Sequence, residues 1–200
     1  MKKLFMIAAM MVATLSVSAQ EAGQMFIKPM VGGTVTTFVG DVDDTKAKIG
    51  LVGGAEFGYN INETFGITAG LLYTMQGSKI KYADDPVNLD YINVPVLANV
   101  YVAPGLALKA GPQIGFMTRA KWDDFDFKKA CNTIDFSIPV GVSYEISDFV
   151  IDFRYNIGIT NILKKGETFI FDDDELEVGV EDIKTRNSVV MLTVGYKIPF

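Results

Sequence analysis

The sequence predicts an all-β fold, namely an eight-stranded antiparallel up-and-down transmembrane β-barrel that follows a cleaved N-terminal signal peptide. Three observations support this prediction: strand-length segments in which apolar and polar residues alternate, short turns that alternate with longer charged loops, and an export signal at the start of the chain. Helical membrane spans are excluded, because each needs about 18 or more consecutive apolar residues and no such stretch follows the N-terminus. The length suits a single domain.

The first 19 residues have the pattern of a secretory signal peptide. Two lysines precede an apolar core, and a small-residue motif that ends at Ala19 favours cleavage before Gln20. The alternative is a structural N-terminal helix. We therefore predict a signal peptide at 1–19 and one barrel domain at 20–200. Removing the two lysines leaves 16 basic against 24 acidic residues, a net charge of −8, which argues against binding to the phosphates of nucleic acid.

The stretch 91–118 shows the sidedness on which the prediction depends. Even positions from Val94 to Val102 are all valine or alanine, odd positions are mixed, and a turn leads to a second arm that alternates likewise. If Val102 lies opposite Leu106, the mixed faces form four pairs: Tyr101–Ala107, Asn99–Lys109, Leu97–Gly111 and Asn93–Gly115. Three of these pairs set a long side chain against a small one, as the interior of a narrow filled barrel requires. The apolar face then points outward, to lipid.

Eight strand-like segments follow the signal peptide, and each is long enough for a tilted strand to cross a bilayer. They span residues 25–38, 48–60, 65–77, 88–102, 106–119, 134–146, 149–162 and 187–200. Short turns alternate with charged loops, and those loops lie at 39–47, 78–87, 120–133 and 163–186. Outer-membrane barrels combine short periplasmic turns with long external loops. The even number of strands then puts both termini on the periplasmic side.

Five prolines lie within these segments, although proline has no backbone N–H for a ladder hydrogen bond. They are Pro29, Pro95, Pro112, Pro139 and Pro199. We expect β-bulges or lost ladder bonds at these positions, because a closed barrel has no free edge on which proline is tolerated.

Three stretches of the chain are similar to one known family. The hairpin YINVPVLANVYVAPGLALKAGPQIGF, the stretch FRYNIGITNI and the closing VGYKIPF resemble strands of the PorT-like outer-membrane barrels of Bacteroidetes. The resemblance implies an eight-stranded barrel in the outer membrane, in a family whose founding member takes part in a secretion system. The terminal Phe200, with Tyr196, resembles the strand signal that the barrel-assembly machinery reads; the alternative is a last strand that simply ends in an aromatic residue. We expect outer-membrane lipid and that machinery as partners, and a monomer.

Charged residues of the strands are candidates for an interior network. The sequence has no histidine, which removes His-dependent catalysis and His-containing metal sites. Seven charged residues share the inward phase near the periplasmic end: Lys28, Glu56, Lys109, Glu145, Asp152, Arg154 and Lys197. Enclosed charges are tolerated mainly when they are paired, so we interpret this set as a polar plug rather than a catalytic or ion-conducting site. Arg154 is predicted to lie opposite Gly141, which leaves its guanidinium room to reach a carboxylate, and we expect no wide aqueous pore.

The external loops contain three weaker candidates. One is an acidic run that has oxygen ligands for Ca²⁺ but lacks EF-hand spacing: Asp172, Asp173 and Asp174. Another is an aromatic group that suits either a contact surface or an aromatic belt: Trp122, Phe125 and Phe127. The third is Cys131, the only cysteine, which is either a thiol whose pKa is lowered by adjacent lysines or an incidental loop residue.

The sequence therefore predicts a non-enzymatic outer-membrane barrel without a cofactor, whose role is envelope-structural or a surface contact made by its external loops. It identifies no extracellular partner. Three alternatives stay open: an accessory of a secretion system, by family analogy; a soluble lipocalin-like barrel with a ligand cavity; and a lipid-modifying enzyme that uses the inward carboxylates of Glu56 and Asp152. A lipocalin-like barrel needs an apolar interior, so the direction of Lys109 and Arg154 distinguishes it from the membrane barrel.

Overall fold

The computed structural model describes residues 21–41, 45–80, 85–123, 125–164, 168–169, 178–179 and 184–200. The predicted signal peptide lies outside these residues, and so does most of the last predicted loop. Within the described part of the chain, no helix is long and apolar enough to cross a membrane.

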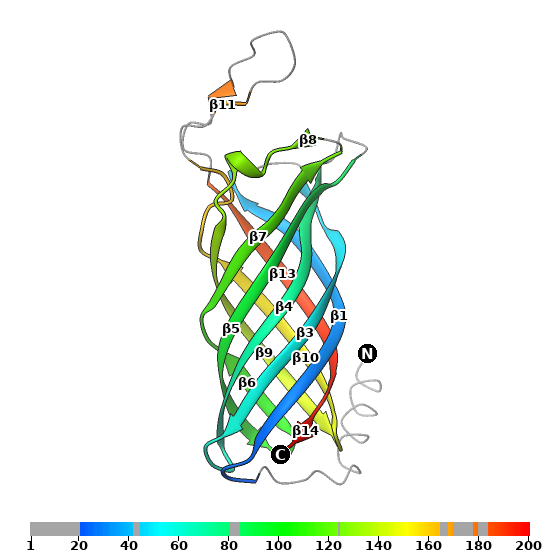
Figure 1. Ribbon diagram of the computed structural model, residues 1–200, viewed down its shortest axis with the longest axis vertical. Coiled ribbons are helices and arrows are strands. Elements are labelled where there is room, and N and C mark those ends of the chain that lie inside the picture. The colour runs from blue at the N-terminus through cyan, green and yellow to red at the C-terminus, as the bar shows by residue number, and fades with distance from the viewer. Residues whose placement is uncertain are drawn as a thin grey trace, which may run out of the picture.

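Eight long strands lie tilted around one axis and form a closed barrel (Figure 1). They are β1 (Met25–Gly40), β3 (Lys48–Asn60), β4 (Phe65–Ile80), β5 (Val87–Ala103), β6 with β7 (Leu106–Ala110 and Gln113–Trp122), β9 (Ile134–Ile146), β10 (Phe149–Gly158) and β13 with β14 (Thr185–Tyr196 and Ile198–Pro199). Neighbouring strands are antiparallel, and β1 closes the ring by pairing with both β3 and β13. The predicted all-β barrel is confirmed.

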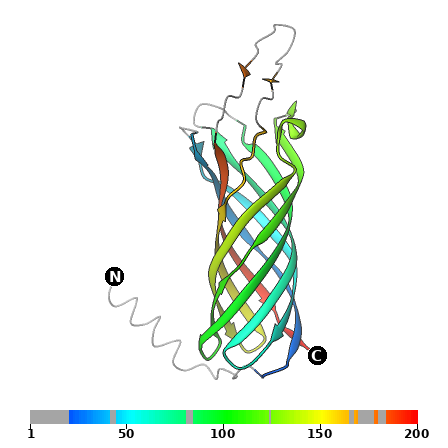
Figure 2. The same ribbon diagram turned by 90° about the vertical axis from the view of Figure 1, so that its left-hand side faces the viewer.

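The two ends of the barrel differ in their connections (Figure 2). Short turns join the strands at one end, which we call the turn end, and Phe200 also lies there. The opposite end, the loop end, has longer connections that contain short elements. These are β2 (Thr45–Lys46), β8 (Phe125–Asp126), the 3₁₀ helix η1 (Lys128–Ala130), β11 (Thr168–Phe169) and β12 (Val178–Gly179). The predicted alternation of short and long connections is confirmed.

Apolar side chains of the long strands point outward and polar ones point inward. On the outer face Ile49 is 80% exposed, Leu108 50% and Ile151 41%. Lys109 and Arg154, by contrast, are 7% and 1% exposed. A continuous apolar outer face is stable in lipid and not in water. The lipocalin-like alternative is therefore wrong, because that fold needs the reverse sidedness.

The pairing of β5 with β6 and β7 follows the predicted register over most of its length. Three predicted pairs are confirmed: Tyr101–Ala107, Asn99–Lys109 and Asn93–Gly115. One pair is wrong, because Ala103, and not Val102, lies opposite Leu106. The register shifts there by a β-bulge, which adds one residue to a strand and increases its local twist next to the turn.

Four of the five prolines lie at missing ladder pairs, and none of them changes the register. Pro112 lies in the break between β6 and β7, Pro139 of β9 lies opposite Gly111 in the same break, and the β4–β5 ladder has no pair at Pro95. Pro29 lies beside the break between β13 and β14, and Pro199 is at the end of the last strand. Pairing resumes in the same register after each break. Lost ladder pairs are confirmed at four of the prolines, whereas Pro199 keeps its pair with Phe26 and the two register shifts of β5 lie away from all five.

Candidate functional site

An ion-pair network fills the barrel interior toward the turn end. Its centre is Arg154, whose Nε and Nη2 atoms donate hydrogen bonds to Asp152 Oδ1 at 2.6 Å and to Oδ2 at 2.8 Å. The remaining nitrogen, Nη1, lies 2.6 Å from Glu56 Oε1. Residues 152 and 154 share a face because they are two positions apart on β10. One arginine therefore bridges carboxylates of β10 and β3, with bidentate geometry toward Asp152.

Two lysines complete this network. Lys28 Nζ lies 2.8 Å from Glu56 Oε2 and 3.5 Å from Asp152 Oδ2. Lys109 Nζ lies 2.7 Å from Asp152 Oδ2. All five side chains are buried, and the three cations against two carboxylates leave a net charge of +1. Charges withdrawn from water are tolerated when each is paired and hydrogen-bonded, and every member of this network has at least one partner of opposite charge.

Glycines on neighbouring strands make room for the charged side chains. Gly141 of β9 has Lys109 as its partner on one side and Arg154 on the other, so the predicted Arg154–Gly141 pair is confirmed. A Cβ atom at Gly141 would lie 3.0 Å from Arg154 Cγ. A Cβ atom at Gly70 would lie 2.8 Å from Glu56 Cγ. The alternation of long and absent side chains therefore fills the lumen to van der Waals contact.

The other two predicted interior residues form a separate pair. Lys197 Nζ lies 3.0 Å from Glu145 Oε2 and 4.7 Å from the centroid of the Phe26 ring, where a cation–π contact adds to the ion pair. The structure thus brings five of the seven predicted residues into one network and places Glu145 and Lys197 outside it.

Uncharged polar side chains occupy the lumen between the network and the loop end. Thr74 Oγ1 accepts hydrogen bonds from Gln76 Nε2 at 2.9 Å and from Asn93 Nδ2 at 2.6 Å. Gln113 Nε2 donates to Ser137 Oγ at 3.0 Å. Our sequence analysis did not identify this layer as a site. The sequence does contain a signal for this layer, because its polar residues occupy inward-facing positions of adjacent strands.

An apolar cluster covers the lumen at the loop end. Its buried members are Val87, Leu89, Tyr91, Met117, Ala120, Cys131 and Ile162. Phe38 and Phe127 pack against it, so Phe127 is part of this cover and not of an outer belt. β10 ends at Gly158 and not at 162 as predicted, because Ile162 turns into the cluster and is only 4% exposed.

Cys131 is a packed member of this apolar cover. It is 0% exposed, and burial raises the pKa of its thiol to about 12. Lys164 acts in the opposite direction, but burial outweighs it. The hypothesis that adjacent lysines lower this pKa is wrong, since a buried thiol is held in its neutral form.

The residues predicted to form an assembly signal lie on the outer face at the turn end. Tyr196 is 42% exposed, and its hydroxyl donates to Asp148 Oδ2 at 3.1 Å. Phe200 is 67% exposed, and its ring centroid is 6.1 Å from that of Phe57. The two aromatic side chains therefore point away from the lumen.

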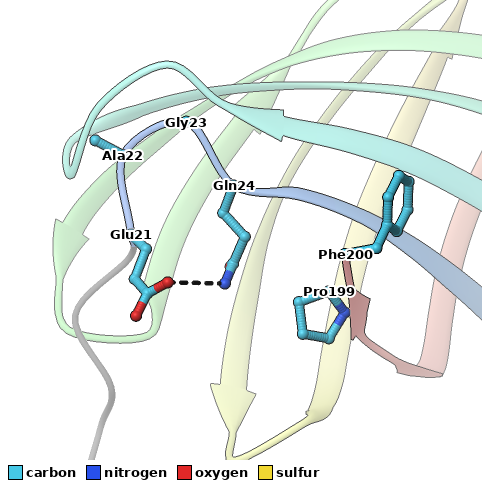
Figure 3. Close-up of a pocket in the computed structure, with 6 residues that line it drawn as sticks. All are labelled: Glu21, Ala22, Gly23, Gln24, Pro199 and Phe200. Atoms are coloured by element: carbon cyan, nitrogen blue, oxygen red, sulfur yellow. Dashed lines mark hydrogen bonds between the residues drawn. The ribbon is translucent and has the colours of Figure 1, made fainter.

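A shallow pocket of about 410 Å³ lies beside the last strand at the turn end (Figure 3). Glu21 and Gln24, joined by a 3.4 Å hydrogen bond, form one side, and Pro199 and Phe200 form the other. None of its polar side chains is buried, and we assign no ligand to it.

Metal-binding clusters were also considered. In the described residues, no group of three or more His, Cys, Asp or Glu side chains is placed to hold a metal ion. The candidate Ca²⁺ ligands Asp172, Asp173 and Asp174 lie outside the described residues.

Comparison with known proteins agrees with this architecture. Residues 5–199 match the family model of the outer membrane protein beta-barrel domain. The chain belongs to this family. Neisserial surface protein A (NspA) has a similar fold, with a TM-score of 0.56, 17% identity, and coverage of 86% of this chain and 97% of that one. The attachment invasion locus protein Ail of Yersinia pestis is also similar, with a TM-score of 0.50, 16% identity, and coverage of 88% and 99%. No curated protein sequence matches the chain.

Proposed function

We propose that this outer membrane β-barrel is a non-conducting, non-enzymatic protein whose biological role is a surface contact made at its loop end. The observation that supports this most directly is the filled lumen. The network of Lys28, Glu56, Lys109, Asp152 and Arg154, the uncharged polar layer and the apolar cover follow one another along the barrel axis. An eight-stranded barrel is just wide enough to be filled in this way.

The charged network serves as a structural plug under this proposal. Its ion pairs join strands from different parts of the ring, namely β1, β3, β6 and β10. Both carboxylates are held by buried cations, which leaves them poorly placed to act on a lipid. We therefore favour the plug over a lipid-modifying enzyme that uses Glu56 and Asp152. The test is mass spectrometry of envelope lipids from cells that express the Glu56→Ala or Asp152→Ala variant, and an altered lipid A would overturn the non-enzymatic role.

The contact surface that the geometry supports best is the extension of β7 into β8. Trp122 and Phe125 face each other across this hairpin and are 36% and 46% exposed. Exposed aromatic side chains of this kind often supply the main binding energy of a protein contact. We place the loop end outside the cell and both termini in the periplasm, because outer-membrane barrels have their short turns on the periplasmic side.

Measurements of ion conductance test whether the lumen is filled. Protein refolded into a planar lipid bilayer should produce no steady large openings. Such openings in most of the insertion events would refute a plugged interior.

Measurements of cell attachment test whether the β7–β8 hairpin makes a surface contact. Cells that display the Trp122→Ala/Phe125→Ala double variant should adhere less to surfaces coated with matrix proteins or with other bacteria than cells with the wild-type barrel. The matched control is Phe116→Ala, which truncates an aromatic residue on the outer face of β7. If wild-type and double-variant cells adhere equally to every surface, the proposed contact role of this hairpin is wrong.

The resemblance to PorT-like barrels supports a finer hypothesis, an accessory role in secretion. It rests on family analogy and not on a site of this barrel. Deleting the gene and comparing secreted and surface proteins measures this role, and an unchanged profile counts against it.

A further inference from the structure

One acidic side chain in the lumen belongs neither to the ion-pair network nor to the Lys197–Glu145 pair. Asp135, at the start of β9, is 6% exposed. Among the described residues, no lysine or arginine is within ion-pairing distance of its carboxylate. A buried carboxylate without a positive partner is strongly unfavourable, so its charge is normally compensated.

A narrow chamber in the uncharged polar layer brings other oxygen atoms toward Asp135. The chamber is lined mainly by polar side chains from five strands, together with Gly158 and Val189: Gln76, Gln113, Asp135, Ser137, Asn156 and Asn187. None of these lining side chains is basic. The amide residues among them are at most 4% exposed.

The amide donors of Gln76 and Asn187 are used, whereas several acceptors of the chamber are not. Asn187 Nδ2 donates to the Tyr91 hydroxyl at 3.1 Å, and Gln76 Nε2 donates to Thr74. The side-chain oxygens of Gln76, Asn156 and Asn187 receive no hydrogen bond from any described residue. Buried polar atoms nearly always have a partner, and leaving one unpaired costs about 1–3 kcal/mol. The chamber therefore has an excess of acceptors around one uncompensated negative charge.

The void among these side chains is narrow. Oxygen ligands approach a hard cation closely, at about 2.3–2.6 Å for Ca²⁺, whereas hydrogen bonds to a water molecule span about 2.7–3.0 Å. A bare cation therefore needs less room than a water molecule does.

We propose that this chamber binds one small monovalent cation, of the Na⁺ type, held by the Asp135 carboxylate and the amide oxygens of Gln76, Asn156 and Asn187. All of these ligands are oxygen atoms, which prefer hard cations to soft ones. One carboxylate balances one positive charge within the chamber, whereas a divalent ion would leave a net positive charge there. The absence of a second acidic lining residue, in the chamber as described, agrees with this choice.

The enclosed position implies that the ion is captured during folding. The charged network closes the lumen on one side of the chamber, and the apolar cover closes it on the other. Cation binding should therefore be measured on protein that refolds in the salt under study. An ion that binds only the folded barrel stabilises it by mass action.

The experiment compares chloride salts of Li⁺, Na⁺, K⁺ and choline at equal ionic strength and mildly alkaline pH. The full chain is refolded into detergent micelles in each salt, and its urea unfolding is then measured. For the wild type, the unfolding midpoint should be higher in at least one alkali salt than in choline chloride. Well above the dissociation constant, the ratio of folded to unfolded protein should rise about tenfold for each tenfold rise in that cation.

Two variants and one control locate the effect. Asp135→Asn should unfold at one midpoint in all four salts, and Gln76→Met should reduce the difference between salts while keeping the carboxylate. The control is Asp85→Asn, which removes an exposed carboxylate and should retain the wild-type preference. Equal wild-type midpoints in all four salts would overturn the proposal and indicate that Asp135 holds a proton instead. A salt preference that survives unchanged in Asp135→Asn would overturn it as well.

Discussion

The most informative single change is Asp152→Asn, because Asp152 contacts more cations than any other carboxylate of the network. It lies at hydrogen-bond distance from Arg154 and Lys109 and 3.5 Å from Lys28. Asparagine keeps the shape of the side chain and removes its charge, so three buried cations are left with Glu56 as the one carboxylate of the network. Breaking a buried ion pair from one side costs about 3–5 kcal/mol. We expect the free energy of unfolding to fall by about that amount.

Lys109, whose Nζ atom lies 2.7 Å from Asp152 Oδ2, should be more tolerant of substitution than Asp152. Lys109→Met removes a cation whose contacts within the described network are to Asp152, and it leaves two cations with two carboxylates. Both carboxylates keep hydrogen-bonded cations, so we expect a loss of less than about 1 kcal/mol. The double variant Asp152→Asn/Lys109→Met should be more stable than Asp152→Asn alone, because it no longer encloses an unpaired lysine.

Urea unfolding in detergent micelles measures these differences. The fluorescence of Trp122, the only tryptophan, reports the loop end, and electrophoretic mobility without heating reports whether the barrel is folded. Equal losses for Asp152→Asn and Lys109→Met would refute the reasoning, since they would show that the number of contacts, and not the balance of enclosed charge, determines stability.

Three further predictions concern packing, thiol chemistry and assembly. Gly141→Ala places a methyl group against the Phe153 carbonyl and should lower the free energy of unfolding by about 1–3 kcal/mol in the same urea titration. The control is Gly33→Ala, where the nearest atom to the new methyl group is 3.8 Å away, and it should change this free energy little. Cys131 should resist alkylation by maleimide until the protein unfolds. Burial raises the pKa of its thiol from 9.0 to about 12, so the thiol of the unfolded chain loses its proton at lower pH than the thiol of the folded chain. The free energy of unfolding should therefore fall as pH rises above about 9. A Cys131→Ala variant should show a weaker decline. Phe200→Ala should reduce the amount of folded barrel in outer-membrane fractions while refolding into detergent continues, and equal amounts in cells would argue against an assembly signal.

The amino-acid sequence by itself determined the sidedness of the barrel. Side chains on a strand alternate with a period of two, so the valine positions around Val94 and the polar positions around Asn93 necessarily face opposite ways. The same alternation, together with the short turns, predicted most of the cross-strand residue pairs, including Asn99 with Lys109 and Arg154 with Gly141. It did not predict the bulge next to Ala103, because a bulge depends on how the turn accommodates strand twist.

Only the tertiary structure decided which charges meet. Lys28 and Glu56 are neighbours across one ladder, but Arg154 reaches Glu56 through the lumen from β10, with β1 and β13 between their strands. Contacts through the lumen depend on closure, tilt and side-chain length, none of which is encoded in local alternation. For the same reason, the structure separated Glu145 and Lys197 from the network and set Asp135 alone among amide oxygens.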